Sequence, residues 1–307
     1  MSPGLPGSSG AILCVVLWGC AQVPKSDYQP KVGPSQTTRP TGTEYAFGVL
    51  PLTNAVRLFE TYQPLIDEIN KQVSGFKVKL ETAKDYPEYE TKVRDRRLQF
   101  VMMNSHLVIP AEEKGYKVIG RTADSIRGVI VVRKDSNFRR PRDLRTMSIS
   151  FGARPDLPGT MMPKVLLRQG GLNLERDAKP KYVASPESVL INVSAGLSAA
   201  GCVSESAWRT FQKDRPDTAQ SLKVRWQTVP MVGLGILARN DVPREHERAV
   251  ANALFGLDET DRGLAILDAM KISSFMPATS ASYDGVWEFL NDYRRMFGRT
   301  PTLGGAE

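Results

Sequence analysis

The first clear pattern in the chain is an alternation of apolar and polar residues over 45–50, which predicts a β-strand running into a turn at Pro51. In the segment that follows, 56–73, the apolar residues recur with the period of a helix instead. Pro64 interrupts it, because proline lacks an amide donor and clashes with the preceding turn. We therefore expect a short helical turn, then a helix with Pro64 in its first turn. The apolar positions at helical spacing are Val56, Phe59, Tyr62, Leu65, Ile66, Ile69 and Val73.

Strand and helix patterns then alternate in two series. The first series predicts a strand at 76–82, a helix at 86–98 and a buried strand at 100–103, and the alternation continues through 130–132. The second series runs from Pro141 to Arg225. It predicts strands at 147–151, 181–183, 200–203 and 223–227, and helices at 161–169, 187–195 and 205–213.

A third block completes the pattern with a strand at 235–238 and amphipathic helices near 245–255, 260–269 and 283–297. Alternating strands and helices are typical of α/β lobes with largely parallel sheets. A chain of 307 residues is long enough for two such lobes, each with its own core.

Charge narrows the class of partner. The chain has 41 Lys and Arg against 33 Asp and Glu, which gives a formal net charge of +8. Such a surplus suits nucleic acid, an anionic membrane surface or a small anion. The basic residues are scattered except at 94–97 and 139–142, and no aromatic residues interleave with these two clusters. We expect solvated faces there and no nucleic-acid partner.

Cysteine and histidine are too few for several kinds of site. Cys202 is the one cysteine of the folded part, and its small apolar neighbours predict a buried structural thiol without a disulfide. With two histidines, a zinc site or a Cys/His dyad has little material. Common hydrolase, phosphate-loop and zinc-protease motifs do not occur. We expect no cofactor, no metal and no catalysis, with a catalytic carboxylate pair left open.

The amino terminus has the pattern of a targeting signal. The apolar run 11–18 is far shorter than the roughly 20 residues of a membrane-spanning helix. Leu17-Trp18-Gly19-Cys20 resembles a bacterial lipobox, which implies cleavage before Cys20 and lipidation of that residue. No Lys or Arg precedes the run and Trp18 is bulky, so a plain signal peptide or a misassigned start codon are the alternatives. We assign 1–19 to a lipoprotein signal peptide and 20–43 to a flexible tether.

From about Tyr45 to Phe297 the chain resembles the phosphate/phosphonate-type periplasmic binding proteins of ABC transporters. The order and spacing of several short motifs carry the resemblance. They are Phe47-Gly48-Val49, Tyr62-Gln63-Pro64-Leu65, Asp85-Tyr86, the segments 100–104 and 131–136, Asp143-Leu144, the segments 185–188, 196–201 and 275–278, and Tyr283-Asp284.

The resemblance implies a two-lobed α/β fold, the type II periplasmic binding protein fold, with a ligand cleft between the lobes. Two crossover strands, 128–132 and 235–239, form the hinge. Lobe 1 is then discontinuous, with 44–132 and 235–298 flanking lobe 2 at 133–234, and 299–307 form a disordered tail.

The implied function is capture of a small oxyanion, such as phosphate, phosphite or a phosphonate, for an ABC importer and its permease. We expect a monomer in the periplasm or at the cell surface, anchored to a membrane through Cys20. Ala21 stands where Asp would retain a lipoprotein at the inner membrane, which favours the outer membrane. The alternative is a sensor of the same fold that signals to a membrane receptor kinase or cyclase.

Candidate ligand contacts follow from where such folds bind. In open α/β sheets the ligand lies beyond the carboxyl ends of the strands, where helix amino termini offer free N–H groups to an oxyanion. Each segment is equally explained as an ordinary helix cap. The expected contacts are Thr53, Asn54, Tyr86, Asn104, Ser105, His106, Gly159, Thr160, Glu187 and Ser188.

Two of these residues have two interpretations. His106 either donates to a phosphate-like oxygen or is a partly exposed side chain in the first turn of a helix. Tyr86 either walls the ligand or fills the core.

Three positions depart from the family pattern. Asp156-Leu157-Pro158-Gly159-Thr160 replaces a Ser-Thr-Ser-Gly helix start, and Pro186 and Ala199 stand where His and Asp are usual. The departures at Pro186 and Ala199 argue against an aminoalkylphosphonate ligand.

Overall fold

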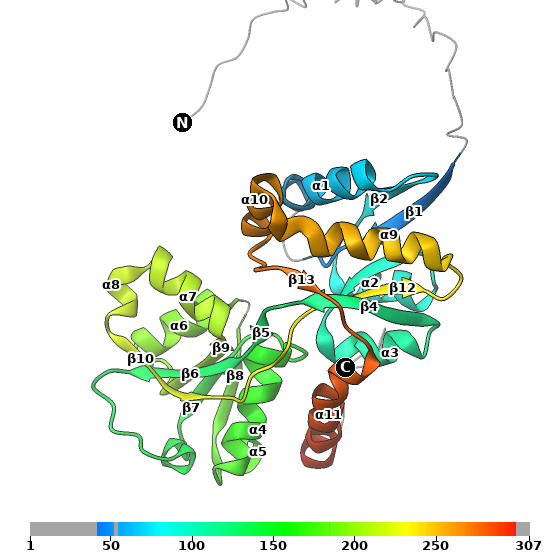
Figure 1. Ribbon diagram of the computed structural model, residues 1–307. Coiled ribbons are helices and arrows are strands. Elements are labelled where there is room, and N and C mark those ends of the chain that lie inside the picture. Colours follow the sequence, from blue (N-terminus) through cyan, green and yellow to red (C-terminus); the bar gives the residue numbers. More distant parts are fainter. Residues whose placement is uncertain (1–41, 52–54, 184, 299–307) are drawn as a thin grey trace, which may run out of the picture. The chain divides into compact units, whose positions relative to one another are not determined.

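The computed structural model describes residues 42–51, 55–183 and 185–298 (Figure 1). Several predictions lie outside these residues: the signal peptide, almost all of the tether, the lipid anchor at Cys20, the ligand contacts Thr53 and Asn54, and the tail 299–307. Within the described part, no helix is long and apolar enough to cross a membrane. The same residues contain no cluster of three His, Cys, Asp or Glu side chains that could hold a metal ion.

The first lobe is built on a six-stranded sheet with the strand order β13-β4-β12-β3-β1-β2. β1 pairs in parallel with β2 and β3. β12 pairs antiparallel with β3 and β4, and β13 pairs antiparallel with β4. The strands are β1 Thr43–Gly48, β2 Phe76–Glu81, β3 Phe100–Met103, β4 Tyr116–Thr122, β12 Gly235–Arg239 and β13 Phe275–Met276.

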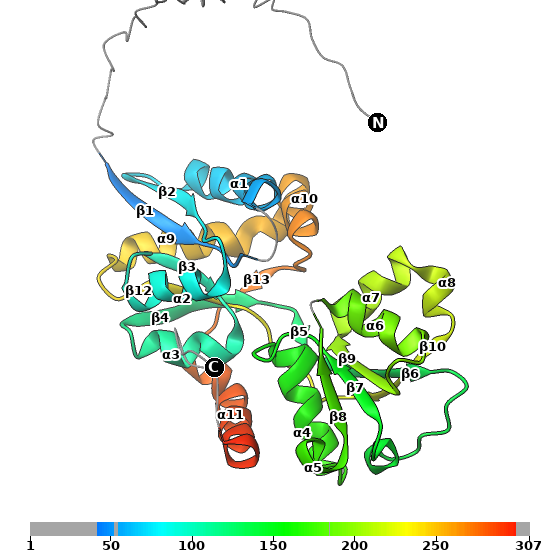
Figure 2. The same cartoon turned by 180° about the vertical axis from the view of Figure 1, so that it is seen from behind.

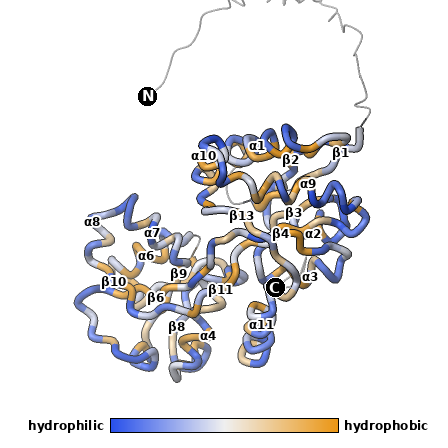
Figure 3. Tube along the Cα trace, in the orientation of Figure 1, coloured by the Kyte–Doolittle hydropathy of each residue, from blue (hydrophilic) through white to orange (hydrophobic). Residues whose placement is uncertain are grey.

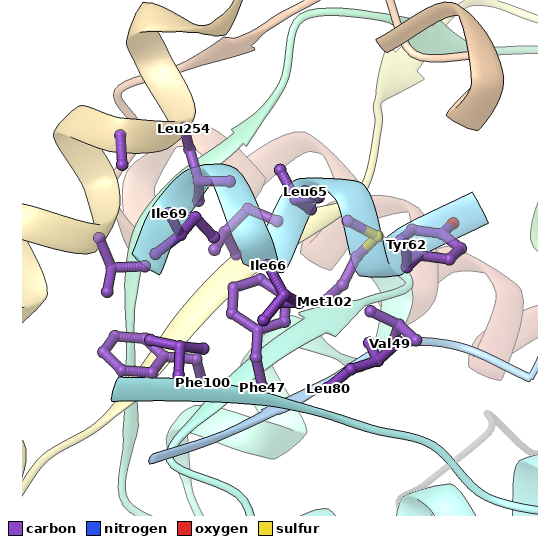
Figure 4. Close-up of a cluster of buried hydrophobic side chains, with 14 of the residues drawn as sticks. Phe47, Val49, Tyr62, Leu65, Ile66, Ile69, Leu80, Phe100, Met102 and Leu254 are labelled. Carbon is purple, nitrogen blue, oxygen red and sulfur yellow. The ribbon is translucent and has the colours of Figure 1, made fainter. Parts of the chain in front are cut away.

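Helices cover both faces of this sheet because its central strands are apolar on both sides. In β3, Phe100 and Met102 belong to one buried cluster, while Val101 and Met103 belong to another, as the two-residue period of a strand requires. Figure 4 shows the first cluster, where α1 packs against the sheet. The first face is covered by α1 (Ala55–Gln72), α9 (Arg244–Phe255) and α10 (Asp261–Met270), and the second by α2 (Tyr86–Arg94) and α3 (Val108–Glu112) (Figures 1 and 2). α11 (Asp284–Phe297) extends away from the sheet, and its buried residues belong to the second cluster together with Leu157, Met161 and Val165.

The second lobe is built on a five-stranded sheet with the order β10-β6-β9-β7-β8. β7 pairs in parallel with β8 and β9, and β6 pairs antiparallel with β9 and β10. The strands are β6 Gly128–Arg133, β7 Ser148–Phe151, β8 Lys179–Tyr182, β9 Ala200–Ser204 and β10 Leu222–Gln227. The helices are α4 Met162–Gln169, α5 Leu174–Asp177, α6 Pro186–Ser194, α7 Glu205–Asp214 and α8 Pro216–Ala219.

The second sheet is also buried on both faces. Val129 and Val131 of β6 pack with α6 and α7, and Ile130 and Val132 pack with α4 and α5. Cys202 of β9 is fully buried in the latter cluster, and burial raises the pKa of its thiol. The prediction of a buried structural thiol is therefore confirmed. In both lobes the apolar positions lie mainly where the helices meet the sheets (Figure 3).

The expectation of largely parallel sheets is wrong, because both sheets are mixed. β12 lies in the middle of the first sheet and runs against its neighbours β3 and β4. β6 runs against both of its neighbours in the second sheet. These are the strands that follow each crossing between the lobes, so they enter their sheet at the edge where the parallel strands end. The alternation of strand and helix in the sequence carries no information about this direction.

The chain crosses between the lobes at a short antiparallel ribbon of β5 (Ser125–Ile126) and β11 (Met231–Val232). The predicted crossover 128–132 lies in β6, and the predicted crossover 235–239 is β12. Each belongs to one sheet, so the ribbon that precedes them carries the crossing. Sheet pairing places 128–132 in the second sheet, although we assigned these residues to lobe 1.

α1 runs without a break through Pro64, so the predicted interruption is wrong. Proline deprives the carbonyl of Glu60 of its helical partner, but Glu60 is exposed and water can replace the missing donor. Packing of the apolar face then holds the helix together, with Leu65 completely buried. The first two apolar positions do not reach this core: Val56 and Phe59 are 70% and 43% exposed.

Candidate functional site

Both sheets are joined to the crossing ribbon at the edge where their parallel strands end. We call this the first edge in the first sheet and the second edge in the second sheet. In the first sheet Gly235, which begins β12, pairs with Met103 at the end of β3 and with Arg121 near the end of β4. In the second sheet Gly128, which begins β6, pairs with Ser204 at the end of β9. The ribbon therefore connects the carboxyl ends of the parallel strands in one lobe to those in the other. These are the ends at which α/β sheets bind ligands.

At the first edge, the residues after β3 are buried and polar. Asn104 ends the strand, and a 3₁₀ turn over Ser105–Leu107 follows. Ser105 and His106 are only 3% and 5% exposed. Neither Ser105 Oγ nor His106 Nδ1 has a hydrogen-bond partner among the residues that the structure describes. Buried polar groups are rarely left unpaired in proteins, so these two atoms mark a place where another molecule can supply the partner.

His106 is neutral in the folded protein. Burial lowers the pKa of its imidazole to about 4, because the charged form would lose its hydration. Of the two interpretations of this residue, a partly exposed side chain in a helical turn is wrong. The tautomer with its proton on Nδ1 would offer one N–H donor to a ligand without adding a charge.

Tyr86 opens α2 and links the first edge to the second. It is half-buried, and burial raises the pKa of its phenol to about 12. A hydrogen bond with Asn104 acts against this rise, and the nearby charge of Asp156 adds to it. The helix start is held by Asp85, whose side chain accepts the Glu88 N–H at 2.9 Å. Tyr86 thus lies at the edge with its hydroxyl close to groups of both lobes.

Tyr283 reaches the same edge, and sequence reasoning did not assign it to the site. Its hydroxyl is buried and has no hydrogen-bond partner within the described residues. A Cβ placed on Gly235 would lie 3.0 Å from Tyr283 Oη, and Gly235 pairs with Met103 at the end of β3. The sequence signal was the glycine that begins a buried strand, because it permits this close approach.

The second edge differs, because its predicted donors are already bonded within the lobe. The Thr160 hydroxyl donates to the Ala153 carbonyl at 2.8 Å, and Thr160 is 1% exposed. The amides of Thr160 and Met161 both donate to the Asp156 carbonyl at 3.0 Å. This turn, over Leu157–Met161, opens the helix that continues as α4.

The Asp156 carboxylate lies at the start of that helix. A Cβ on Gly159 would lie 2.3 Å from Asp156 Oδ2, so only glycine leaves room for the carboxylate in this position. The Gly159 N–H favours the charged carboxylate, although the Asp156 side chain forms no regular N-cap hydrogen bond among the residues described. Burial outweighs this effect and raises the pKa of the Asp156 carboxyl. The candidate donor Gly159 therefore faces an anion of the protein itself.

The predicted contacts on α6 have the geometry of a helix cap. Ser185 Oγ accepts the Ser188 N–H at 3.1 Å and lies 3.0 Å from Ser188 Oγ. The Glu187 carboxylate lies 2.9 Å from the Arg215 guanidinium, and both side chains are at least half exposed. Both residues thus have partners within the second lobe, as the capping interpretation expects.

Arg127 is a further residue that the sequence patterns did not single out. It lies between β5 and β6, directly before Gly128, and its carbonyl accepts the Glu205 N–H at 2.8 Å. Its Nη1 donates to Gln227 at 3.1 Å, but its buried Nε has no partner among the described residues. A cation thus stands where the chain enters the second sheet at its carboxyl edge.

Comparison with known proteins gives one consistent group. A family model described as "ABC transporter, phosphonate, periplasmic substrate-binding protein" matches residues 47–283. A curated relative from Prochlorococcus marinus (strain MIT 9301), named "Probable ABC transporter phosphite binding protein PhnD1", is 22% identical over 258 residues. The match covers 78% of this chain and 86% of the relative.

Solved structures of similar shape include PhnD1 of Prochlorococcus marinus in complex with methylphosphonate, with a TM-score of 0.69 and 20% identity over 82% of this chain and 99% of that one. A Xanthomonas citri protein bound to ATP has a TM-score of 0.70 and 16% identity, over 85% and 100% of the two chains. A binding protein component of a phosphonate ABC transporter from Pseudomonas aeruginosa has a TM-score of 0.67 and 15% identity, over 83% and 88%. These structures confirm the predicted two-lobed fold.

Proposed function

This chain belongs to the phosphonate-type periplasmic substrate-binding proteins of ABC transporters, and we propose that it captures a small oxyanion of the phosphite, phosphate or phosphonate class. The family match spans parts of both lobes, from residue 47 to residue 283. As a member of this family the chain is an extracytoplasmic binding protein that serves a membrane permease, and not an enzyme. The resemblance noted in the sequence is thereby confirmed.

The observation that carries the proposal is the set of unpaired buried groups at the first edge. Ser105 Oγ, His106 Nδ1 and Tyr283 Oη are all buried without a hydrogen-bond partner among the described residues. Leaving such a group unpaired costs about 1–3 kcal/mol. A hydroxyl and a neutral imidazole can donate to the oxygens of an anion, so a bound oxyanion would remove this cost at several atoms together.

Charge at the crossing segment supports the same class of ligand. The Arg127 guanidinium has one buried N–H without a partner in the described part of the chain. Hydrogen bonds from a charged donor are roughly twice as strong as neutral ones, and a planar guanidinium can donate two N–H groups to two oxygens of one oxyanion. We therefore add Arg127 and Tyr283 to the proposed contacts Tyr86, Asn104, Ser105 and His106.

We propose that the ligand is compact, from the names of the relatives and from the positions of Pro186 and Ala199, the two residues that differ from the family pattern. The relatives carry names that refer to phosphite and methylphosphonate, which are both compact. Ala199 precedes β9 at its amino end, opposite the carboxyl edge, so its difference from the family pattern does not bear on the site. Pro186 occupies the first turn of α6, directly after the N-cap Ser185, and has no N–H to donate.

A titration panel tests this function. Phosphite, phosphate, methylphosphonate, 2-aminoethylphosphonate, sulfate and acetate are each titrated into the full chain by isothermal titration calorimetry. We expect saturable one-to-one binding of at least one phosphorus oxyanion and none of acetate. Absence of binding by every phosphorus oxyanion would overturn the proposal.

We also propose that the protein is a monomer held at a membrane by a lipid on Cys20. The support is the sequence Leu17-Trp18-Gly19-Cys20, followed by a segment rich in Pro, Gly, Ser and Thr that would act as a tether. Metabolic labelling with a fatty acid should mark the parent protein and not Cys20→Ser. Equal labelling of both would exclude this anchor.

A further inference from the structure

Asp156 brings a carboxylate to the second edge, where the helix running through α4 begins. The carboxylate packs against Gly159, whose N–H points toward it. It also lies close enough to Tyr86 of the first lobe for its charge to raise the pKa of that phenol. Asp156 thus stands at the second edge and near Tyr86, which is one of the residues that we propose for the oxyanion site.

No charged side chain compensates this carboxylate within the described residues. Burial raises the pKa of Asp156, and the Gly159 N–H is the one group that opposes the rise. The neighbouring elements carry the following charged and titratable groups, and none of them forms an ion pair with Asp156 among the described residues. In the second lobe, Arg154 lies over the Tyr182 ring at 4.1 Å, and Lys164 of α4 lies 4.6 Å from the Phe297 ring and 3.8 Å from Glu175. Glu205 of α7 pairs with Arg209, and Arg127, which precedes β6, donates to Gln227. The remaining groups are Tyr293 on α11 and Tyr86 and Glu90 on α2.

A ligand anion at this edge would meet an anion of the protein. Two like charges at close range in a poorly solvated place cannot both stay ionised, and one proton is then shared between them. The proton can reside on Asp156 or on a ligand oxygen. In either arrangement the complex contains one proton more than the separate ionised partners.

We propose that Asp156 couples oxyanion binding to the uptake of one proton, and that the site thereby selects oxyanions able to carry a proton, such as phosphite and methylphosphonate, over sulfate and sulfonates. This inference rests on the proposed function, because it concerns the same site. A protonated phosphonate oxygen donates to the carboxylate, which is an acceptor only. Sulfate has no proton to donate at neutral pH, so its binding requires protonation of Asp156 itself.

Methylphosphonate and sulfate are the probes, titrated calorimetrically into the full chain and into Asp156→Asn between pH 6 and pH 9. For the parent protein we expect the association constant of methylphosphonate to fall about tenfold per pH unit above the second pKa of the ligand. Asp156→Asn should lose this slope, and its preference for methylphosphonate over sulfate should shrink by at least about tenfold. An unchanged slope in Asp156→Asn would overturn the inference.

Asp135→Asn is the matched control, because it removes the same charge from an exposed position paired with Arg133 in the same lobe. It should behave like the parent. If Asp156→Asn does not fold, calorimetry of the parent with methylphosphonate above the second pKa of the ligand, in two buffers of different ionisation enthalpy, still measures proton uptake, and a value near zero there overturns the inference. A parent protein that binds no phosphorus oxyanion at any pH contradicts the proposed function instead.

Discussion

The two edges that meet at the crossing ribbon use their polar groups in opposite ways. At the first edge, Ser105, His106 and Tyr283 each bury a polar atom without a partner among the described residues. At the second edge, the Thr160 hydroxyl and the Thr160 and Met161 amides are all bonded within the lobe. Both edges end parallel strands and both begin helices, so the topology alone does not distinguish them.

This difference shows which features of a fold indicate binding. A helix start whose groups are bonded internally is complete without a ligand, and its cap stabilises the lobe. A buried group without a partner destabilises the free protein and is retained when another molecule completes it. By this measure the first edge has free donors to offer a ligand, whereas the donors of the second edge are bonded and that edge carries the Asp156 carboxylate.

The largest effect that would test the contrast between the two edges is the pH dependence of the unfolding free energy that His106 causes. The folded pKa is about 4 against an unfolded pKa near 6.5, so the unfolded chain takes up the proton first as the pH falls. Stability should therefore decrease between pH 6.5 and pH 4 by about 3 kcal/mol from this residue alone. The measurement is urea unfolding of the parent and His106→Gln at pH 7 and pH 4.5.

The variant isolates this effect, because acidic groups that titrate in the same range contribute equally to both proteins. The difference in unfolding free energy between parent and variant should change with pH in favour of the variant at low pH. A difference that is the same at both pH values would mean that His106 is not held neutral, and the first edge would resemble the second more closely.

The next effect concerns ligand affinity at the first edge. Ser105→Ala removes a donor and should leave a ligand oxygen unpaired, which weakens binding by about 1–3 kcal/mol, or roughly tenfold to a hundredfold. The free protein should not lose stability and should gain some, since the variant no longer buries a hydroxyl that lacks a partner within the described part of the chain. Ser74→Ala, at an exposed position of the same lobe, is the matched control for calorimetric titration with methylphosphonate. Equal affinity of both variants would remove Ser105 from the site.

The smallest effect is expected at the second edge. Thr160→Val keeps the shape of the side chain but removes the bond to the Ala153 carbonyl. The unfolding free energy should fall by about 1 kcal/mol, whereas ligand affinity should stay within about twofold of the parent. Chemical denaturation and calorimetry of the same preparation separate the two quantities. A tenfold loss of affinity with unchanged stability would show that the two edges share the ligand equally.

Local patterns predicted the elements well and their arrangement less well. The strand 100–103 was predicted with its exact bounds, because a run of four apolar residues between polar ones is typical of a short buried strand. Pro64 led to a wrong prediction. The local rule for proline predicted an interruption of the helix, but packing of the apolar face of α1 against the sheet keeps the helix continuous. The directions of β12 and β6 depend on where the chain crosses between the lobes, which periodicity does not encode.

The sequence indicates where the candidate site lies more readily than which residues line it. The segment 104–106 follows a recognisable strand, so its place at a carboxyl edge could be inferred. Tyr283 and Arg127, which we propose as further contacts, lie in segments far away in the sequence, and no spacing rule connects them to 104–106. Asp156 was visible only as a departure from the family pattern, because its effect depends on burial and on the missing cation nearby.

The position of β12 has a consequence for how the chain folds. β3 and β4 follow each other in the sequence but are not neighbours, because β12 lies between them. The strands of the second sheet are contiguous, from β6 to β10, so that lobe can form before the chain is complete. The first sheet remains split until the residues after Gly235 arrive, and contacts of such long sequence separation form slowly. Assembly should therefore begin with the lobe that lies in the middle of the sequence, and β3 and β4 should find their shared neighbour β12 only after that lobe has been made.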